Sequence, residues 1–224
     1  EEVFDAAPST TAPYSAGKVK ASALQAAADR LNALRRIAGL PAVTLDLSLC
    51  EDAQYGAVIQ AANGSLDHYP DQPAGMGDSF YQQAKSASAS SNLAAGHTLT
   101  GAVDAFMDDS DASNIATLGH RRWQLNPTLG KVGFGYAVSG RGYSRYVAEK
   151  VFDRSGAGCD YDFIGWPASG SFPAQLFDGG TAWSVILNST AYQTAVKSAL
   201  TETLTRESDG KTWTFSSRGS DGFF

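Results

Sequence analysis

The stretch NIATLGHRRWQLNPTLGKVGFGYA, residues 114–137, joins a helical turn to a strand that is punctuated by glycine. Ile115 and Leu118 fall on one side of the turn, as expected for a short helical segment that faces a core. His120 directly follows Gly119, where the helical turn is expected to stop. Because rigid elements on both sides would aim its ring, the imidazole of His120 is a candidate functional group.

Strands are predicted after this point. KVGFGYAV, which starts near Lys131, and SRYVAEKVF are separated by SGRGY, whose glycines favour a hairpin loop. AWSVILN is a third predicted strand, and the turn SDGK followed by the alternating residues around Trp213 indicates a last hairpin. Gly133 and Gly135 in the first strand are typical of close packing by another element.

Two long helices are predicted near the start of the chain. Apolar residues recur at steps of three and four over residues 21–38, which predicts an amphipathic helix. The second helix is predicted over residues 48–62, with Ser48 and Glu51 as a capping box and Gly64 after its end.

Two further helices are predicted before the central stretch. One lies in SFYQQAKSASASSN, and the other runs from Thr98 or Thr100 through Asp109. The chain therefore has helices first and antiparallel strands afterwards, which predicts an α+β layered fold rather than a doubly wound one.

The composition indicates a globular protein and argues against nucleic-acid-binding and membrane-spanning classes. The chain has 224 residues, 43% of them hydrophobic, so it can bury a sizeable core. A net charge of −6 and a pI near 5.0 argue against a nucleic-acid partner. No apolar run approaches the ~20 residues of a membrane span. Residues 1–18 are rich in Ala, Pro, Ser and Thr, which predicts a linker, left after removal of an upstream export segment, in a secreted or surface protein.

Cys50 and Cys159 are the only cysteines, and they are far apart in the sequence. Two interpretations stay open. Either both are small buried thiols, or they form one long-range disulfide in an oxidising compartment.

Charged and aromatic residues cluster after His120. For Arg121 and Arg122, ion pairing with nearby aspartates competes with recognition of a ligand carboxylate. Trp123 belongs to a set of aromatics that predicts either core packing or an apolar groove for a lipid or glycan. The other members of the set are Tyr143, Tyr146, Trp166 and Phe172.

The order of these segments resembles the superfamily of cysteine-rich secretory proteins, antigen 5 and plant pathogenesis-related proteins. The resemblance rests on LNALRRIAGLPAVTLDLSLCEDAQYGA, then His68, Asn92, AFMDD and LGHRRWQLNPTLGKVGFGYA. The chain looks most like the bacterial branch, because of Gly-His-Arg-Arg-Trp and the later Trp166-Pro167 and Phe172-Pro173.

The resemblance implies a three-layer α-β-α sandwich with a central antiparallel sheet and a C-terminal β extension. The family domain is expected over residues 19–190, after the linker of residues 1–18, and the extension over residues 191–224, packed on the same domain. It also implies secretion to the extracellular space or the cell surface.

The resemblance further implies a cleft lined by two histidines and two acids. His68 and His120 match the histidines, and Asp109 matches one acid. Ser91, before Asn92, falls where the family commonly has glutamate, so a hydroxyl replaces a carboxylate. Contacts to a ligand are expected from four neighbours of this cleft, Asn92, Arg121, Arg122 and Trp123.

Two neutral imidazoles, His68 and His120, are reasonable ligands for zinc or another divalent metal. Only Asp109 would compensate the charge of the ion, so metal affinity is expected to be weak. His97 lies near the predicted start of the helix that carries Asp109 and is interpreted as an exposed capping-region residue rather than a third ligand.

Three functions follow from this cleft. The leading hypothesis is a non-enzymatic binding module for a small apolar molecule, a lipid, a peptide or a surface component. The alternative is a weak metal-dependent hydrolase that uses His68, His120 and Asp109. Ser91 beside either histidine is a further arrangement for hydrolysis, but no Gly-x-Ser-x-Gly elbow supports it. The third hypothesis is a structural surface module with a degenerate cleft.

Overall fold

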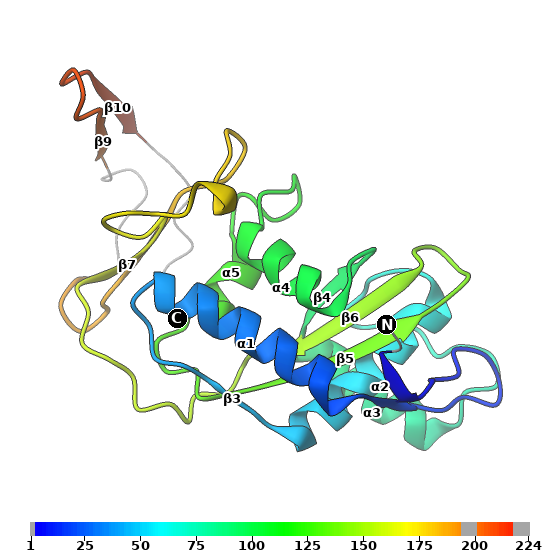
Figure 1. Ribbon diagram of the computed structural model, residues 1–224. Helices are drawn as coiled ribbons and strands as arrows, with labels where there is room; N and C mark the ends of the chain where they lie inside the picture. The colour runs from blue at the N-terminus through cyan, green and yellow to red at the C-terminus, as the bar shows by residue number, and fades with distance from the viewer. Residues whose placement is uncertain (1–2, 194–200, 217–224) are drawn as a thin grey trace.

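A four-stranded sheet forms the centre of the computed structural model, which describes residues 3–193 and 201–216 (Figure 1). In spatial order its strands are β3 (Thr44–Leu45), β5 (Lys131–Val138), β6 (Arg145–Lys150) and β4 (Asn92–Ala95). β5 and β6 form the predicted hairpin, and β4 runs antiparallel to β6. β3 adds a short parallel edge beside β5.

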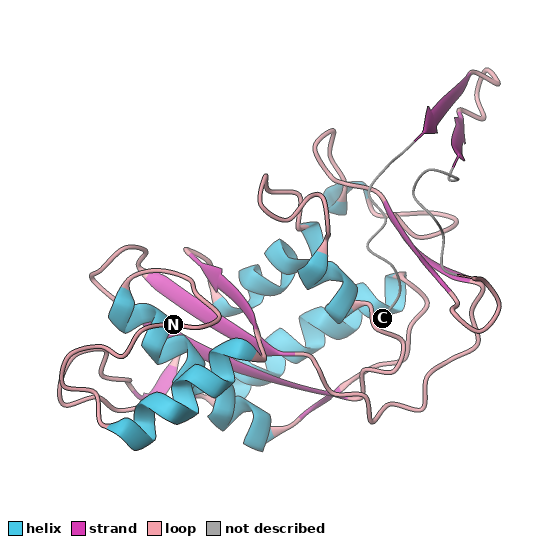
Figure 2. Cartoon of the chain, turned by 180° about the vertical axis from the view of Figure 1, so that it is seen from behind, coloured by secondary structure: helices cyan, strands magenta, loops and turns pink. Residues whose placement is uncertain are grey.

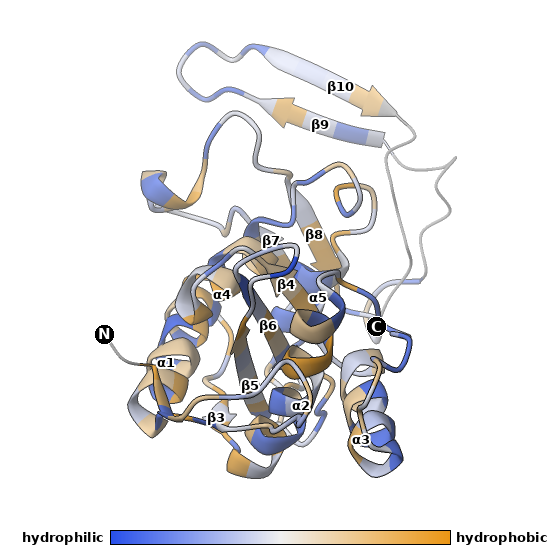
Figure 3. Ribbon diagram, turned by 90° about the vertical axis from the view of Figure 1, so that its right-hand side faces the viewer, coloured by the Kyte–Doolittle hydropathy of each residue, from blue (hydrophilic) through white to orange (hydrophobic). Residues whose placement is uncertain are grey.

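Helices cover both faces of the sheet, which confirms the expected α+β fold and its α-β-α sandwich (Figure 3). α1 (Ala21–Ile37) and α4 (Leu99–Asp108) share a buried apolar cluster with Phe134 and Val147 of the sheet. α2 (Leu47–Asn63) packs its alanines on the opposite face, and α3 (Asp78–Ala89) packs against α2.

α2 approaches β5 very closely. A Cβ atom built on Gly133 would lie 2.3 Å from the carbonyl carbon of Leu49, and one on Gly135 would lie 2.3 Å from that of Ala53. No side chain fits between two backbones at this separation, so the prediction of close packing at these glycines is confirmed.

The start of α2 differs from the prediction. The helix begins at Leu47, and its N-cap is Asp46, whose carboxylate accepts hydrogen bonds from the backbone N–H groups of Ser48 (3.0 Å) and Leu49 (3.1 Å). The predicted capping box is therefore wrong, because an aspartate two residues earlier serves the same orphan donors. Gly64 ends the helix in the left-handed conformation, as predicted.

The turn before His120 also differs from the prediction. Thr98 caps α4 as expected, and the helix ends at Asp108. The predicted helix stop at Gly119 is wrong, because Gly119 begins a new short helix, α5 (Gly119–Gln124). Leu118, in the left-handed region with a φ of 50°, is its N-cap. His120 therefore lies in the first turn of a helix rather than after the end of one.

The C-terminal part carries two small antiparallel sheets. β7 (Phe163–Trp166) pairs with β8 (Ser184–Leu187), and a 3-10 turn, η1 (Ala174–Leu176), lies between them in the chain. β9 (Thr201–Thr205) and β10 (Thr212–Ser216) form the predicted last hairpin. The hairpin stands off from the sandwich (Figures 1 and 2). Within the predicted extension, residues 194–200 and 217–224 lie outside the described residues.

The N-terminal segment differs from the predicted linker over its described residues. β1 (Phe4–Ala6) pairs with β2 (Lys18–Val19), and the Phe4 ring stacks on Tyr136 at a centroid distance of 5.7 Å. The carbonyl oxygen of Ala16 accepts a hydrogen bond of 2.8 Å from Gln54. A few anchoring contacts hold this segment to the domain although its composition is that of a linker.

Both cysteines are free thiols, Cys50 buried and Cys159 partly buried. Burial raises the pKa of Cys50 to about 11, so this thiol behaves as a small apolar side chain. Among the described residues, no helix combines the length and the apolar content needed to cross a lipid bilayer.

Candidate functional site

Asp109 and His120 form the best-defined polar pair of the predicted cleft. Asp109 follows α4 in the left-handed conformation, with a φ of 47°, which turns the chain away from the helix. One carboxylate oxygen accepts a hydrogen bond of 2.8 Å from Nδ1 of His120. The other accepts from the backbone N–H groups of His120 (3.0 Å) and Arg121 (3.3 Å). The Asp109 carboxylate therefore caps the N-terminus of α5 and at the same time orients the ring of His120.

This arrangement leaves one ring nitrogen of His120 for a ligand. Because the Nδ1 hydrogen is donated to Asp109, Nε2 of the neutral ring keeps its lone pair. The ring also packs on Phe106 at a centroid distance of 5.0 Å. The side chain of His120 is 20% exposed and that of Asp109 only 1%, so solvent reaches the histidine but not the acid that holds it.

A second, fully buried acid lies behind this pair. Glu149 of β6 is directly opposite Asn92 of β4 in the sheet register. Its carboxylate accepts a hydrogen bond of 3.0 Å from the Asn92 amide and two, of 2.9 and 3.1 Å, from the Gln124 amide. The same Asn92 nitrogen lies 3.4 Å from the carbonyl oxygen of His120, which links Glu149 to the helix that carries the histidine.

Burial dominates the protonation of Glu149. It raises the pKa of this carboxyl from 4.5 to about 7, while the Gln124 and Asn92 amides and the nearby His120 partly offset the rise. Oε1 of Gln124 is buried and has no hydrogen-bond partner among the described residues. A half-turn of this amide would present that oxygen to the protonated acid as an acceptor. The site can therefore hold Glu149 in either protonation state.

His68 lies on an exposed loop beside α3. Its Nδ1 is 2.9 Å from the carbonyl oxygen of Ser88 in the last turn of that helix. A carbonyl oxygen can only accept a hydrogen bond, so Nδ1 carries the hydrogen and Nε2 is available here too. His68 and His120 thus both contact the junction of α3 and β4, through Ser88 and Asn92 respectively.

Ser91 takes no part in this polar network. The residue is fully buried, and its hydroxyl donates a hydrogen bond of 2.7 Å to the carbonyl oxygen of Ala87, one turn back in α3. Its neighbour Asn92 points to the opposite side and reaches Glu149. The arrangement gives no support to Ser91 as a nucleophile, because its proton is directed to a backbone carbonyl rather than to a base.

The residues after His120 have separate roles. Arg121 is fully buried and donates to the carbonyl oxygens of Met107 (2.6 Å), Ala182 (2.7 Å) and Asp108, and to the hydroxyl of Ser184 (3.1 Å). Burial lowers the pKa of Arg121 to about 10. Its guanidinium ties α5 to the end of α4 and to the start of β8, and its full burial gives no support to the expected ligand contact.

Trp123 and Arg122 are both half-buried. The indole of Trp123 packs on Phe152 at a centroid distance of 4.0 Å, and the guanidinium of Arg154 lies 6.0 Å from the same ring. Trp123 is therefore at least partly a packing residue. His97 is exposed, directly before the N-cap of α4, in agreement with its interpretation as a capping-region residue.

The donor set does not fit a protein-held zinc ion. Over residues 3–193 and 201–216, no group of three or more His, Cys, Asp or Glu side chains is placed to hold a metal. Both oxygens of Asp109 already accept hydrogen bonds from α5, and those of Glu149 accept from amides. Two imidazoles without a third protein ligand fall short of zinc coordination in proteins.

Two surface pockets lie on the described structure, and the second is lined in part by Asp108, next to Asp109. One, of about 380 Å³, is bounded by the N-terminal segment and the end of α2, and the other, of about 390 Å³, by α1, α4 and η1. Neither pocket is lined by His68 or His120. The side chain of His120 is 20% exposed, so a ligand can reach this ring only along its partly exposed side.

Sequence reasoning missed Glu149 and Gln124. A signal was present in SRYVAEKVF, where a glutamate follows three residues suited to a buried strand. A carboxylate in such a strand needs hydrogen-bond donors nearby. The donors come from Asn92 and Gln124, which are distant in the sequence, so the partnership itself was not visible.

Comparison with models of protein families identifies the family of the chain. The family model described as CAP, the cysteine-rich secretory protein family, matches residues 28–151, more than half of the chain. The matched range contains the polar network around His120 and ends before β7. No curated protein matches the chain.

Proposed function

The chain belongs to the cysteine-rich secretory protein family, and from this premise we propose that it is an extracellular or cell-surface binding domain of bacterial origin. Its ligand binds at the exposed edge of His120. The orientation of that ring carries the proposal, since Asp109 fixes Nδ1 and leaves Nε2 as an acceptor at a partly exposed surface. A fixed acceptor of this kind adds specificity to a contact at little entropic cost.

Binding is favoured over hydrolysis by the groups around this edge. Hydrolysis requires an activated nucleophile within reach of a base. The hydroxyl of Ser91 is buried and donates to the carbonyl oxygen of Ala87. The carboxylate oxygens of Asp109 and Glu149 already accept hydrogen bonds from other groups of the protein. His120 therefore has an orienting acid without a nucleophile to activate.

The partial exposure of His120 favours one of the ligand classes expected from the sequence. Enclosed apolar cavities suit small lipids, and neither of the two pockets named above is lined by the histidines. A peptide or a polar component of a cell surface can approach Nε2 from solvent and donate a hydrogen bond to it. We therefore assign a peptide or surface component as the ligand class.

A selection from a random peptide library tests this assignment. The wild-type protein is the target, and His120→Ala serves for counter-selection. Selected peptides are expected to bind the wild type in calorimetry and to bind His120→Ala about fivefold more weakly, since one hydrogen bond contributes about 1 kcal/mol. EDTA is expected to leave the affinity unchanged.

His97→Ala is the matched control, because it removes an exposed histidine outside the site and should leave the affinity unchanged. Peptides that need a divalent metal, or that are hydrolysed, would point to the enzyme alternative. If every selected peptide bound His120→Ala as tightly as the wild type, the structural-module alternative would replace the proposal.

A further inference from the structure

The guanidinium group of Arg35 is a buried positive charge in the last turn of α1. Its Nε donates a hydrogen bond to the carbonyl oxygen of Pro41 (2.9 Å), and Nη1 donates to those of Gln124 (2.6 Å) and Asn126 (3.0 Å). These acceptors are neutral, and Nη2 has no acceptor at all among the described residues. A buried cation needs a negative charge nearby to offset the loss of its hydration.

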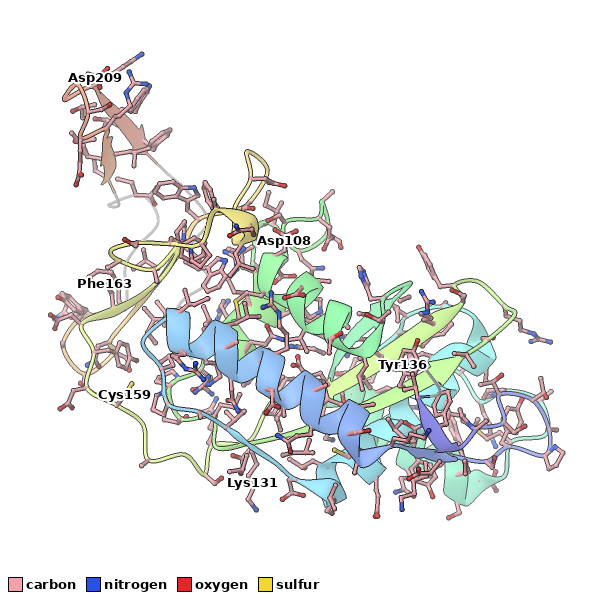
Figure 4. All side chains as sticks on the ribbon, viewed as in Figure 1. Asp108, Lys131, Tyr136, Cys159, Phe163 and Asp209 are labelled. Carbon is pink, nitrogen blue, oxygen red and sulfur yellow. The ribbon has the colours of Figure 1, made fainter. Side chains whose placement is uncertain are left out.

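The thiol of Cys159 is the neighbour that can supply this charge. Burial lowers the pKa of Arg35 to about 10, and the negative charge of the Cys159 thiolate acts in the opposite direction. Cys159 also packs on the apolar cluster that contains Leu34, the residue before Arg35 in α1. Figure 4 labels Cys159 near the end of this helix. The sulfur and the guanidinium are therefore neighbours, although the two residues are distant in the sequence.

Backbone contacts hold the loop of Cys159 on the same side of the molecule. The N–H group of Gly156 donates a hydrogen bond of 2.9 Å to the carbonyl oxygen of Thr128. A Cβ atom built on Gly158 would lie 3.9 Å from Cγ2 of the same threonine. Thr128 in turn donates through its N–H group (3.0 Å) and its hydroxyl (2.9 Å) to the side chain of Asn126, whose carbonyl oxygen accepts from Arg35. The fold thus brings this loop to Arg35 independently of any charge on the sulfur.

Solvent reaches Cys159 but scarcely reaches the other thiol. Cys159 is partly buried, whereas Cys50 is only 5% exposed and its sulfur lies 3.4 Å from the backbone nitrogen of Phe134. Burial raises the pKa of Cys50 to about 11, which is typical of an inert core thiol. A reactive thiol needs a nearby cation, because the thiolate is the nucleophile, and it needs access for the reagent. Cys159 has both.

The other charged and ionisable neighbours of Cys159 oppose Arg35 only weakly. Asp160 and Asp162 are exposed, so solvent and salt screen their charges. Arg35 acts instead through the protein interior, where charges interact more strongly. Burial and the charge of Cys159 raise the pKa of Tyr161, so this phenol stays neutral. The strongest charge that acts on the sulfur is therefore positive.

We propose that Cys159 is a reactive thiol that exchanges with low-molecular-weight disulfides, and that Arg35 stabilises its thiolate. The thiolate sulfur attacks one sulfur of the disulfide, and a new S–S bond forms as the old one breaks. The departing sulfur leaves with the electron pair of the broken bond and takes a proton from water. The Cys159 sulfur is thereby oxidised to a mixed disulfide, and the departing sulfur is reduced to a thiol. Cys159 lies outside the matched family range, and the proposal does not depend on the ligand of His120.

The test follows the reaction of the full chain with hydroxyethyl disulfide, an uncharged reagent, at pH 7. Mass spectrometry of the digested protein measures the mixed disulfide at each cysteine over time. Cys159 of the folded protein is expected to react about fivefold faster than Cys159 of the chain unfolded in urea, because the rate follows the thiolate fraction. Cys50 is expected to react only after unfolding. A short cysteine peptide in both solutions corrects for the effect of urea, and a folded-state rate no higher than the corrected unfolded-state rate would overturn the proposal.

Three variants of the folded protein separate charge from structure. Arg35→Gln removes the buried charge and is expected to lower the rate of Cys159 about fivefold, whereas Arg35→Lys keeps the charge and should stay within about twofold of the wild type. Arg36→Gln makes the same change at the exposed next residue of α1 and should leave the rate unchanged. An unchanged rate in Arg35→Gln, or a loss that Arg35→Lys shares in full, would contradict the role of Arg35. If circular dichroism shows that Arg35→Gln is unfolded, the comparison of folded with unfolded wild type decides alone.

Discussion

Glu149→Gln is expected to make the protein more stable than the wild type above pH 7 and to remove a pH dependence between pH 4.5 and 7. In the folded wild type, burial raises the pKa of Glu149 from 4.5 to about 7. The folded state therefore binds this proton more tightly than the unfolded state does. The stabilisation that this proton contributes is fully present below pH 4.5 and is lost as the pH rises through about 7.

The expected loss is large for one residue. Each pH unit between the two pKa values removes about 1.4 kcal/mol from the free energy of unfolding, so the whole interval removes about 3 kcal/mol. The amide of the variant has no charge to bury, and rotation of the Gln124 amide would let its unpartnered oxygen accept a hydrogen bond. Urea unfolding at a series of pH values between 5 and 8 measures the difference.

Glu51→Gln is the control, because Glu51 is exposed on α2. It should keep the pH dependence of the wild type. If Glu149→Gln unfolds with the same dependence on pH as the wild type, Glu149 is not the buried proton-binding group that its surroundings indicate.

Gly135→Ala is expected to lower the free energy of unfolding by about 3 kcal/mol, which is at the upper end of the range for an overpacked core. The added Cβ would lie 2.3 Å from the carbonyl carbon and oxygen of Ala53 in α2. Both are backbone atoms, so relief requires the helix to move away from the sheet. The melting temperature should fall by about 6–12 °C for a chain of this size, measured by circular dichroism or calorimetry.

Gly140→Ala is the matched control, because a Cβ atom at Gly140 meets no atom within 4 Å. The free energy of unfolding of this variant is expected to lie within about 0.5 kcal/mol of that of the wild type. A melting temperature of Gly135→Ala within one degree of the control would show that α2 does not pack directly on β5.

The elements could be predicted wherever the periodicity of apolar residues was regular. α1 and the β5–β6 hairpin lie within a residue or two of the prediction, because apolar spacing and glycine-rich turns are local signals. The predicted start of α2 was wrong and α5 was not predicted, since Asp46 and Asp109 supply their caps. Asp109 does so from eleven residues upstream of His120, beyond the reach of a local pattern.

The site could be predicted only in part. Asp109 and His120, which the resemblance assigns to one cleft, are in contact, and Ser91 is a hydroxyl where the family commonly has an acid. The second acid near His120 comes instead from Glu149 on the neighbouring strand, opposite Asn92. The position of Glu149 near His120 depends on the pairing of strands that are distant in the chain, and this pairing could not be predicted from the sequence alone.

His120 is proposed to offer a binding edge rather than a metal centre. Calorimetric titration of freshly chelated protein with zinc at about pH 8, where ordinary imidazoles are neutral, tests it most directly. The wild type and His68→Ala/His120→Ala are expected to give the same small heats, without saturable one-to-one binding at micromolar zinc. One-to-one binding by the wild type that the double variant abolishes would contradict the claim and support the metal-dependent alternative.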